Sequence, residues 1–268
     1  MRVVKMHGCG NDFCVIPYEP NKDYKELAIK MCNRKTGIGA DGMIVVKNEP
    51  LEMLFYNQDG SMAPMCGNGI RCFSKYCYEN KLFRGKIFEC LTGAGKLSLQ
   101  VTSDDPFMVK VNMGKPNFQN SMIYASDSMS CFNRVISVND LDIVTYSFFM
   151  GTIHTVIFVD SFHDLVLKYA DDICNHKLFS RKTNVNFVKI IDKSTIEVKT
   201  YERGVGWTLA CGTGCCATVV AASKLGLTKK NVKVILELGY LNIEIDKKDN
   251  VFMTGPAVTV FTCDYKED

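Results

Sequence analysis

The sequence predicts an α/β (α+β) protein made of two pseudo-symmetric halves, each a curved, mostly antiparallel sheet around one central helix. An eight-residue pattern with Cys-Gly-x-Gly at its centre occurs at residues 65–72 and again at residues 210–217. Each copy opens an apolar stretch with helical spacing, and a helix that is apolar all round has to be buried. Landmarks on both sides of the two copies keep a nearly constant offset along the chain, which indicates an internal repeat.

Length and composition are those of an ordinary globular protein. The 268 residues, 47% hydrophobic and 23% charged, suit one large domain or two of ordinary size. The net charge of +3 is small and its signs are interspersed, so no basic stripe for nucleic acid forms. No apolar run reaches about 18 residues, and residues 1–13 lack the apolar core of a signal peptide. We therefore expect a cytoplasmic protein with neither a membrane nor a nucleic-acid partner.

Thirteen cysteines are present, an odd number with irregular spacing. A disulfide framework is therefore disfavoured in a chain of this length. No Cys-x-x-Cys pair occurs and only four His are present, so no metal site is expected. Most of these cysteines are interpreted as small buried apolar residues. Cys66 and Cys211, one in each copy of the repeated pattern, are the exceptions.

The first half is predicted to contain strands and two helices. Glycines mark a turn at residues 7–12, Asp59-Gly60 marks another, and Leu27 and Met31 share one helical face. Strands are expected at residues 1–4, 13–16, 43–46, 51–57, 86–90, 96–101 and 108–113, and helices at residues 24–34 and 70–80.

The second half is predicted to repeat this order. Strands are expected at residues 155–159, 184–191, 195–201, 232–236, 241–245 and 251–253, with helices at residues 165–174 and from the second Cys-Gly pattern to Gly226. The boundary is expected where Gly, Pro and Asn cluster at residues 114–120. We therefore assign residues 1–115 to a first domain with Cys66 and residues 116–256 to a second with Cys211.

A cysteine at the start of a helix, followed by Gly-x-Gly, has two physical consequences. The N–H groups and the positive end of the helix dipole favour a bound anion, and they also stabilise a thiolate. Two such sites related by pseudo-twofold symmetry suit proton abstraction from one face of a carbon and return to the other. The converging N–H groups would stabilise charge on a carboxylate as its α-proton leaves.

The same residues allow other interpretations. Residues 212–217 fit a dinucleotide fingerprint but lie too near the C-terminus for the rest of such a domain. A phosphate loop would need Gly-Lys-Ser/Thr, which does not follow. A Cys66–His154 hydrolase leaves Cys211 unexplained. In the plainest interpretation both cysteines are core residues that start helices.

Ordered motifs extend over nearly the whole chain. They lie at residues 5–13, 39–42, 57–61, 66–72, 111–114, 183–185, 201–204, 210–214 and 253–256. In these motifs the sequence resembles the diaminopimelate epimerase family, the cofactor-independent amino-acid racemases and epimerases.

This resemblance implies a barrel-like sheet around each helix, an active site in the cleft, and a C-terminal strand at residues 257–268 that returns to the first domain. It implies that Cys66 and Cys211 are the two acid–base residues, used without pyridoxal phosphate or metal. His154 and Glu202 match the family's supporting pair beside the thiols.

The resemblance also implies a set of binding residues. The N–H groups of Gly67, Asn68, Gly212 and Thr213 would hold the reacting carboxylate, and the pocket would be lined by Asn11, Asn57, Thr152, Asn184 and Arg203. Taken singly, these residues have plainer explanations. Asn57 fits turn chemistry, Arg203 fits a surface ion pair with Glu202, and His154 fits a satisfied buried histidine.

Two departures from the family pattern bear on the substrate. The family usually has Gly-Asn-Pro-His where this chain has Thr152-Ile153 before His154, and Glu where Trp207 stands. The reaction implied first is interconversion of LL- and meso-diaminopimelate, a step toward lysine and peptidoglycan precursors. The same two-thiol chemistry on histidine or lanthionine is the alternative, and a catalytically silent amino-acid-binding protein is a third. The expected partner is a small amino acid, and a homodimer is compatible with the sequence.

Overall fold

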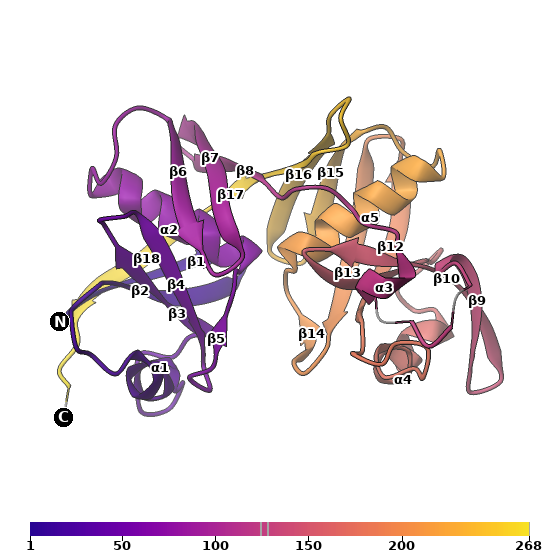
Figure 1. Cartoon of the computed structure of the whole chain (residues 1–268), viewed down its shortest axis with the longest axis horizontal. Coiled ribbons are helices and arrows are strands. Elements are labelled where there is room, and N and C mark those ends of the chain that lie inside the picture. Colours follow the sequence, from indigo (N-terminus) through magenta and orange to yellow (C-terminus); the bar gives the residue numbers. More distant parts are fainter. Residues whose placement is uncertain (124, 128, 268) are drawn as a thin grey trace. The chain divides into compact units, whose positions relative to one another are not determined.

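A computed structural model describes residues 1–267 except 124 and 128. The chain forms two compact units. Unit 1 contains Met1–Asn112 and the segment from Thr254 onwards, and unit 2 contains Met113–Met253. Each unit carries one long helix among its strands (Figure 1). In the part of the chain that the structure describes, no helix is both long enough and apolar enough to cross a membrane.

Unit 1 is built from short strands and two helices. Its elements are β1 (Arg2–Gly8), β2 (Asn11–Pro17), α1 (Tyr24–Cys32), β3 (Gly42–Lys47), β4 (Glu52–Asn57), β5 (Met62–Ala63), α2 (Gly67–Glu79), β6 (Ile87–Thr92), β7 (Gly95–Asp104), β8 (Phe107–Asn112) and β18 (Val258–Asp264). The last strand, β18, pairs antiparallel with the first strand, β1, so residues from both ends of the sequence lie side by side in the sheet of unit 1.

Unit 2 has the same kinds of element. They are α3 (Asn120–Ile123), β9 (Phe132–Val138), β10 (Leu141–Met150), β11 (Thr152–Phe158), the 3-10 helix η1 (Leu165–Tyr169), α4 (Ala170–Cys174), β12 (Asn184–Asp192), β13 (Thr195–Glu202), β14 (Gly206–Thr208), α5 (Gly212–Lys224), β15 (Asn231–Leu236) and β16 (Gly239–Ile245). Strand β17 (Val251–Pro256) begins in unit 2 and ends in unit 1.

The strands of the two units pair in the same order. In unit 1, β2 runs parallel to β3, β3 antiparallel to β4, β4 antiparallel to β5 and parallel to β6, and β6 antiparallel to β7. In unit 2, β11, β12, β13, β14, β15 and β16 repeat every one of these pairings in turn. The predicted fold class, two repeated α/β halves, is confirmed.

The long helix of each unit is buried, as its sequence requires. In α5 every residue from Cys215 to Ala222 is buried, because Ala, Val, Cys and Thr are small enough for strands to approach on several sides. In α2 the first turns are buried and the last turn is more exposed. The buried part of both helices therefore includes the first turn, where the repeated Cys-Gly pattern lies.

The prediction of a single helix at residues 165–174 is wrong. The chain forms the 3-10 helix η1 and then the short α4, and the buried residues are only Ala170, Ile173 and Cys174 of α4. The bond from the Leu167 N–H to the Asp164 carbonyl (3.2 Å) has the shorter 3-10 spacing. None of the η1 side chains is fully buried, so no packing favours an α-helical turn there.

Two tight turns differ from the prediction. Strands β1 and β2 extend through most of residues 7–12, because Cys9 and Gly10 alone make the turn, with φ of 55° and 89°. The hairpin of β9 and β10 was not predicted. Asn139 and Asp140, with φ of 48° and 63°, connect its strands, and this left-handed pair is the hairpin turn that Asn and Asp tolerate.

Candidate active site

In unit 1, Cys66 is the N-cap residue of α2. The Gly69 N–H donates to its Sγ (3.3 Å), and the first intrahelical bond runs from the Ile70 N–H to the Cys66 carbonyl (2.8 Å). Residues 67–69 thus occupy the helix positions whose N–H groups have no intrahelical acceptor. Such a turn stabilises an anion, either a thiolate on Cys66 or a bound carboxylate.

Two asparagines lie beside Cys66. The Asn11 Oδ1 is 3.8 Å from the Cys66 Sγ and accepts a hydrogen bond from the Asn68 Nδ2 (3.1 Å). Asn11 begins β2 and Asn68 is the second residue of α2, so the hairpin of β1 and β2 lies against the start of the helix. The structure thus brings together four residues that are predicted from the sequence: Asn11, Cys66, Gly67 and Asn68.

Asn57 is placed differently. Its Nδ2 donates to the Ser61 Oγ (2.9 Å) and its N–H to the Ser61 carbonyl (2.8 Å). Both bonds stay within the turn that follows β4. The turn interpretation therefore accounts for every hydrogen bond described for this side chain.

In unit 2, Cys211 is the N-cap residue of α5, at the position that Cys66 has in unit 1. The Cys215 N–H donates to its carbonyl (2.9 Å), and its Sγ lies 3.6 Å from the Thr213 Oγ1. Only 5% of Cys211 is exposed. Burial and the negative charge of Glu202 raise the pKa of the Cys211 thiol well above its usual value, while hydrogen bonds from Thr213 and the Gly214 N–H act in the opposite direction. Cys211 is therefore held as a thiol.

Glu202 ends β13, and its neighbours fix its direction. Strands β13 and β14 pair antiparallel, with Glu202 opposite Gly206. The Thr208 Oγ1 on β14 donates to the Glu202 Oε1 (2.8 Å). The hairpin of β13 and β14 leads directly into α5. This connection places the Glu202 carboxylate close enough to Cys211 to act on the thiol.

His154, on β11, is completely buried and neutral. The Asn186 Oδ1 accepts from the Thr200 hydroxyl (3.1 Å), so the Asn186 Nδ2 faces the His154 Nδ1 (3.1 Å). The Nδ1 therefore accepts, and the ring proton lies on Nε2, which has no hydrogen-bond partner among the described residues. Burial, with Arg203 as a second cause, lowers the pKa of His154 to about 3.

The remaining predicted residues of unit 2 form a second polar group. The Arg203 N–H donates to the Asn184 Oδ1 (3.0 Å), and its guanidinium donates to the Thr152 Oγ1 (3.0 Å) and the Arg181 carbonyl (2.8 Å). Asn184 and Thr152 come together because β11 and β12 run parallel, with His154 opposite Asn184. Arg203 follows Glu202 directly, so this group adjoins the Cys211 site.

The geometry of these sites is accompanied by similarity to known sequences. The family model of diaminopimelate epimerase matches residues 3–119 and 146–260. The chain belongs to the diaminopimelate epimerase family. This family is one of cofactor-independent epimerases, so the predicted family and reaction class are confirmed.

Full-length relatives carry the family's name. A diaminopimelate epimerase of Clostridium perfringens (strain 13 / Type A) is 45% identical over 273 residues, which cover 98% of each chain. Another, of Alkaliphilus metalliredigens (strain QYMF), is 40% identical over 263 residues, which cover 94% of this chain and 93% of that one.

Solved structures with much lower identity share the fold. A phenazine biosynthesis protein of the PhzF family from Bacillus anthracis has a TM-score of 0.72 at 14% identity, with 98% of each chain covered. A probable proline racemase from Agrobacterium radiobacter K84 has a TM-score of 0.72 at 13% identity, with 100% of this chain and 93% of that one covered. At these identities the likeness concerns the fold alone.

The departures from the diaminopimelate epimerase pattern lie in two different environments. Thr152 accepts a hydrogen bond from Arg203, so its hydroxyl belongs to the polar group around this arginine. Ile153 is 2% exposed and packs in the hydrophobic core of unit 2. It therefore contributes to packing and not to the polar group around Arg203.

Trp207 does not share a strand face with the catalytic candidates. Its ring packs against Tyr201 (centroids 5.5 Å apart, edge-on) and Phe187 (5.7 Å) and remains 49% exposed. Its neighbour Thr208 contacts Glu202, and adjacent residues of a strand point to opposite faces. The tryptophan therefore covers the side of the sheet away from Glu202.

Two buried polar residues of this diaminopimelate epimerase family member are not among the site residues predicted from the sequence. Asn186 is completely buried and orients His154, and its two-residue spacing from Asn184 was an available signal. Arg71, also completely buried, donates to the carbonyls of Gly67 and Pro256 (both 2.9 Å). A buried arginine one turn into α2 adds positive charge near the Cys66 site.

Proposed function

We propose that this protein is a cofactor-independent epimerase that interconverts LL- and meso-diaminopimelate, with Cys66 and Cys211 as its acid–base pair. Family membership and full-length relatives that are 40–45% identical support the reaction. The observation that carries the assignment of the two thiols is their matched position. Each half has one cysteine at the N-cap of its buried helix, followed by glycine-rich first-turn positions that suit a carboxylate.

The proton balance of the proposed reaction is symmetric. A thiolate takes the α-proton, and the electron pair left on the α-carbon delocalises into the adjacent carboxylate. The other thiol then gives its proton to the opposite face of that carbon and becomes the thiolate. Cys211 starts as the acid in one direction, because burial and Glu202 raise its pKa. Cys66 starts as the base in that direction, and the roles exchange in the reverse reaction.

The polar groups around Cys211 supply further functions in this proposal. The buried Nε2–H of His154 is a donor that costs free energy unless a partner arrives, and a substrate oxygen or nitrogen would supply one. The Arg203 guanidinium, which also binds Thr152, would hold a substrate carboxylate with Asn184 alongside. Asn11 and Asn68 would orient the substrate near Cys66. Asn57 would contact the substrate from the turn that follows β4.

A cytoplasmic location fits the proposal. Among the described residues no cysteine forms a disulfide, which suits a compartment that keeps thiols reduced. A homodimer is retained as a proposal for the assembled enzyme, to be tested by sedimentation.

The proposal is tested by proton NMR of the purified protein in deuterated water without added cofactor. LL-diaminopimelate, lanthionine and L-histidine are offered separately, and loss of the α-proton signal is followed together with inversion by chiral chromatography. Preferential exchange and inversion of diaminopimelate is expected. Rapid inversion of histidine or lanthionine with inert diaminopimelate would instead assign the alternative substrate. Binding of an amino acid without exchange would contradict the two-thiol reaction and favour a binding protein.

A further inference from the structure

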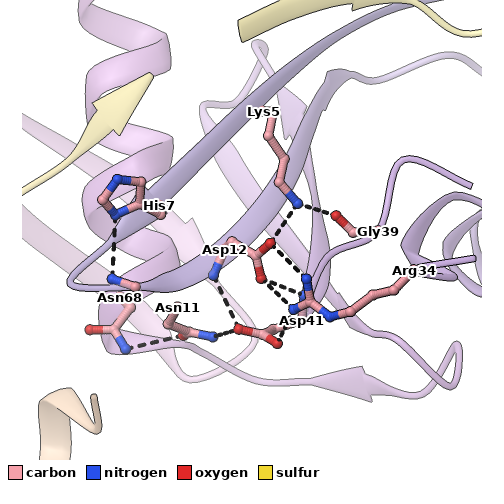
Figure 2. A network of polar contacts seen from close by, with 9 residues as sticks. Lys5, His7, Asn11, Asp12, Arg34, Gly39, Asp41 and Asn68 are labelled. Atoms are coloured by element: carbon pink, nitrogen blue, oxygen red, sulfur yellow. Dashed lines mark hydrogen bonds and ion pairs between the residues drawn. The ribbon is translucent and has the colours of Figure 1, made fainter. Parts of the chain in front are cut away.

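A continuous set of polar contacts leads from Asp41, at the start of β3, through Asn11 to Asn68 (Figure 2), and Asn11 also contacts Cys66. Asp41 directly precedes β3, and it lies beside Asn11 because β2 and β3 run parallel with Phe13 opposite Gly42. The Asp41 Oδ2 accepts from the Asn11 Nδ2 (2.7 Å) and from the Asp12 N–H (3.1 Å). One carboxylate oxygen thus holds the first two residues of β2.

This contact determines which way the Asn11 amide points. An ionised carboxylate only accepts hydrogen bonds, so the atom of Asn11 that faces Asp41 has to be Nδ2. The Oδ1 then points to the other side, where it accepts from the Asn68 Nδ2 (3.1 Å) and lies 3.8 Å from the Cys66 Sγ. With Asp41 in place, Cys66 faces an acceptor oxygen and not an NH₂ group.

Asp41 is itself held by charged neighbours. The Arg34 guanidinium donates to the Asp41 Oδ1 (2.7 Å) and to both oxygens of Asp12 (2.7 and 3.2 Å). Lys5 donates to Asp12 (2.6 Å) and to the Gly39 carbonyl. Burial opposes ionisation of Asp12, but the bonds from Arg34 and Lys5 outweigh it and hold the pKa of this carboxyl far below its usual value. The network is therefore charged and ordered at neutral pH.

We propose that Asp41 is a positioning residue for Cys66, which it acts on through the amide of Asn11. Two contacts then oppose each other at the Cys66 sulfur. The Gly69 N–H stabilises the thiolate, and the Asn11 Oδ1 stabilises the thiol by accepting its S–H. A cysteine that serves as base in one direction and acid in the other needs both forms accessible, so this role deepens the proposed function and rests on it.

The test measures the reactivity of Cys66, which requires no substrate. Each variant is treated with iodoacetamide at one neutral pH, and the alkylation rate of the Cys66 peptide is divided by that of the Cys263 peptide. Cys263 is the other half-buried cysteine and lies on β18 of the same unit. In Asp41→Ala the amide of Asn11 is released, and this ratio is expected to rise roughly threefold to tenfold, the effect of one hydrogen bond.

A matched control is available in unit 2. Asp127, like Asp41, binds an arginine, although it does so through both oxygens and Asp41 through one. Its side chain is 42% exposed against 43% for Asp41. Asp127→Ala should leave the ratio unchanged. In an Asn11→Ala background, Asp41→Ala should cause no further change, because the residue that transmits its effect is gone.

The outcomes separate this role from general stability and from the proposed function. An unchanged ratio in a folded Asp41→Ala, or an equal rise in Asp127→Ala, would overturn the role of Asp41. If Asp41→Ala does not fold, Arg34→Gln replaces it. The ratio should then rise about twofold, since Asp41 loses only one of its hydrogen bonds. No rise in this variant would overturn the proposal. Failure of diaminopimelate exchange in the wild type, with the ratio responding as expected, would refute the proposed reaction and leave the positioning of Cys66 intact.

Discussion

The two halves place a cysteine at the same helix position but surround it differently. Cys66 in unit 1 is half-buried and meets neutral groups, the Gly69 N–H and the Asn11 amide. Cys211 in unit 2 is buried and lies near the carboxylate of Glu202, which raises its pKa. The repeated motif therefore specifies where a thiol lies, and the neighbouring strands specify how easily it ionises.

The polar residues near the two cysteines also differ between the units. Unit 1 holds Asn11 through an ionic network with Asp41, Asp12 and Arg34 that is partly exposed to water. Unit 2 holds its site through the fully buried amide and imidazole of Asn186 and His154. The difference implies that mutations and pH should affect the two sites unequally, which the following predictions measure.

The largest effect is expected from removal of either thiol. Cys66→Ala and Cys211→Ala should each lower the rate of diaminopimelate inversion by about 10² to 10⁴, the usual contribution of a general acid or base. The measurement is inversion by chiral chromatography, with the melting temperature as the control for folding. Near-full inversion by either folded variant would show that its thiol is not part of the acid–base pair.

The next effect compares two matched glycines. A Cβ on Gly214 would lie 2.3 Å from the Asn186 Oδ1, whereas on Gly69 its nearest neighbour would be the Cys66 Cβ at 3.2 Å. Gly214→Ala should lower the free energy of unfolding by about 1–3 kcal/mol through overpacking. Gly69→Ala should change it by less than about 1 kcal/mol, because alanine favours the helix while the contact is tight. Urea midpoints provide the comparison, and equal losses would contradict it.

Acid should destabilise unit 2 before unit 1. The pKa of His154 falls from 6.5 to about 3 in the folded protein, so below pH 6.5 the unfolded chain takes up a proton that the folded chain does not. The contribution of neutral His154 to the free energy of unfolding is thus fully present above pH 6.5. It is lost as pH falls toward 3, by up to about 1.4 kcal/mol per pH unit. For Asp12, whose folded pKa lies below its ordinary 3.8, stability is lost only as pH falls below about 3.8.

Hydrogen exchange of peptides from each unit at pH 7 and pH 5 measures this difference. Peptides of β11 and β12 should lose protection at pH 5 while those of β2 and β3 keep it. His154→Gln, which cannot titrate, is the control and should remove most of the pH dependence in unit 2. Equal loss in both units, or an unchanged dependence in the variant, would show that another group is responsible.

The smallest effect concerns the charge beside Cys211. Glu202→Gln removes the carboxylate that, after burial, helps to raise the pKa of this thiol. Alkylation of Cys211 should therefore become severalfold faster, because a larger share of the sulfur is ionised. Cys66 in the other unit is the internal reference and should not change. Thr213→Val removes a contact that favours the thiolate and should slow Cys211 instead. A response in the same direction from both variants would contradict this account.

Much of the fold could be predicted because its signals are local or repeated. Strands are predicted at residues 86–90 and 96–101, on either side of Gly93 and Gly95, and at the matching residues 232–236 and 241–245; both hairpins form. The hairpin of β9 and β10 was missed because no repeat of a first-half motif marks it. Residues 165–174 were misjudged because their apolar spacing suits a helix, whereas packing supports only the last turn.

For the site, the sequence by itself determined that Cys66 and Cys211 begin helices with glycine-rich first turns, since capping depends on a few consecutive residues. It also determined the repeat and the family, because these depend on order along the chain. The tertiary structure alone decided that Asp41 orients Asn11, that Thr208 orients Glu202 and that Trp207 faces away from Glu202. Those contacts depend on strand register and on the face to which each side chain points, and pairing between distant segments sets both.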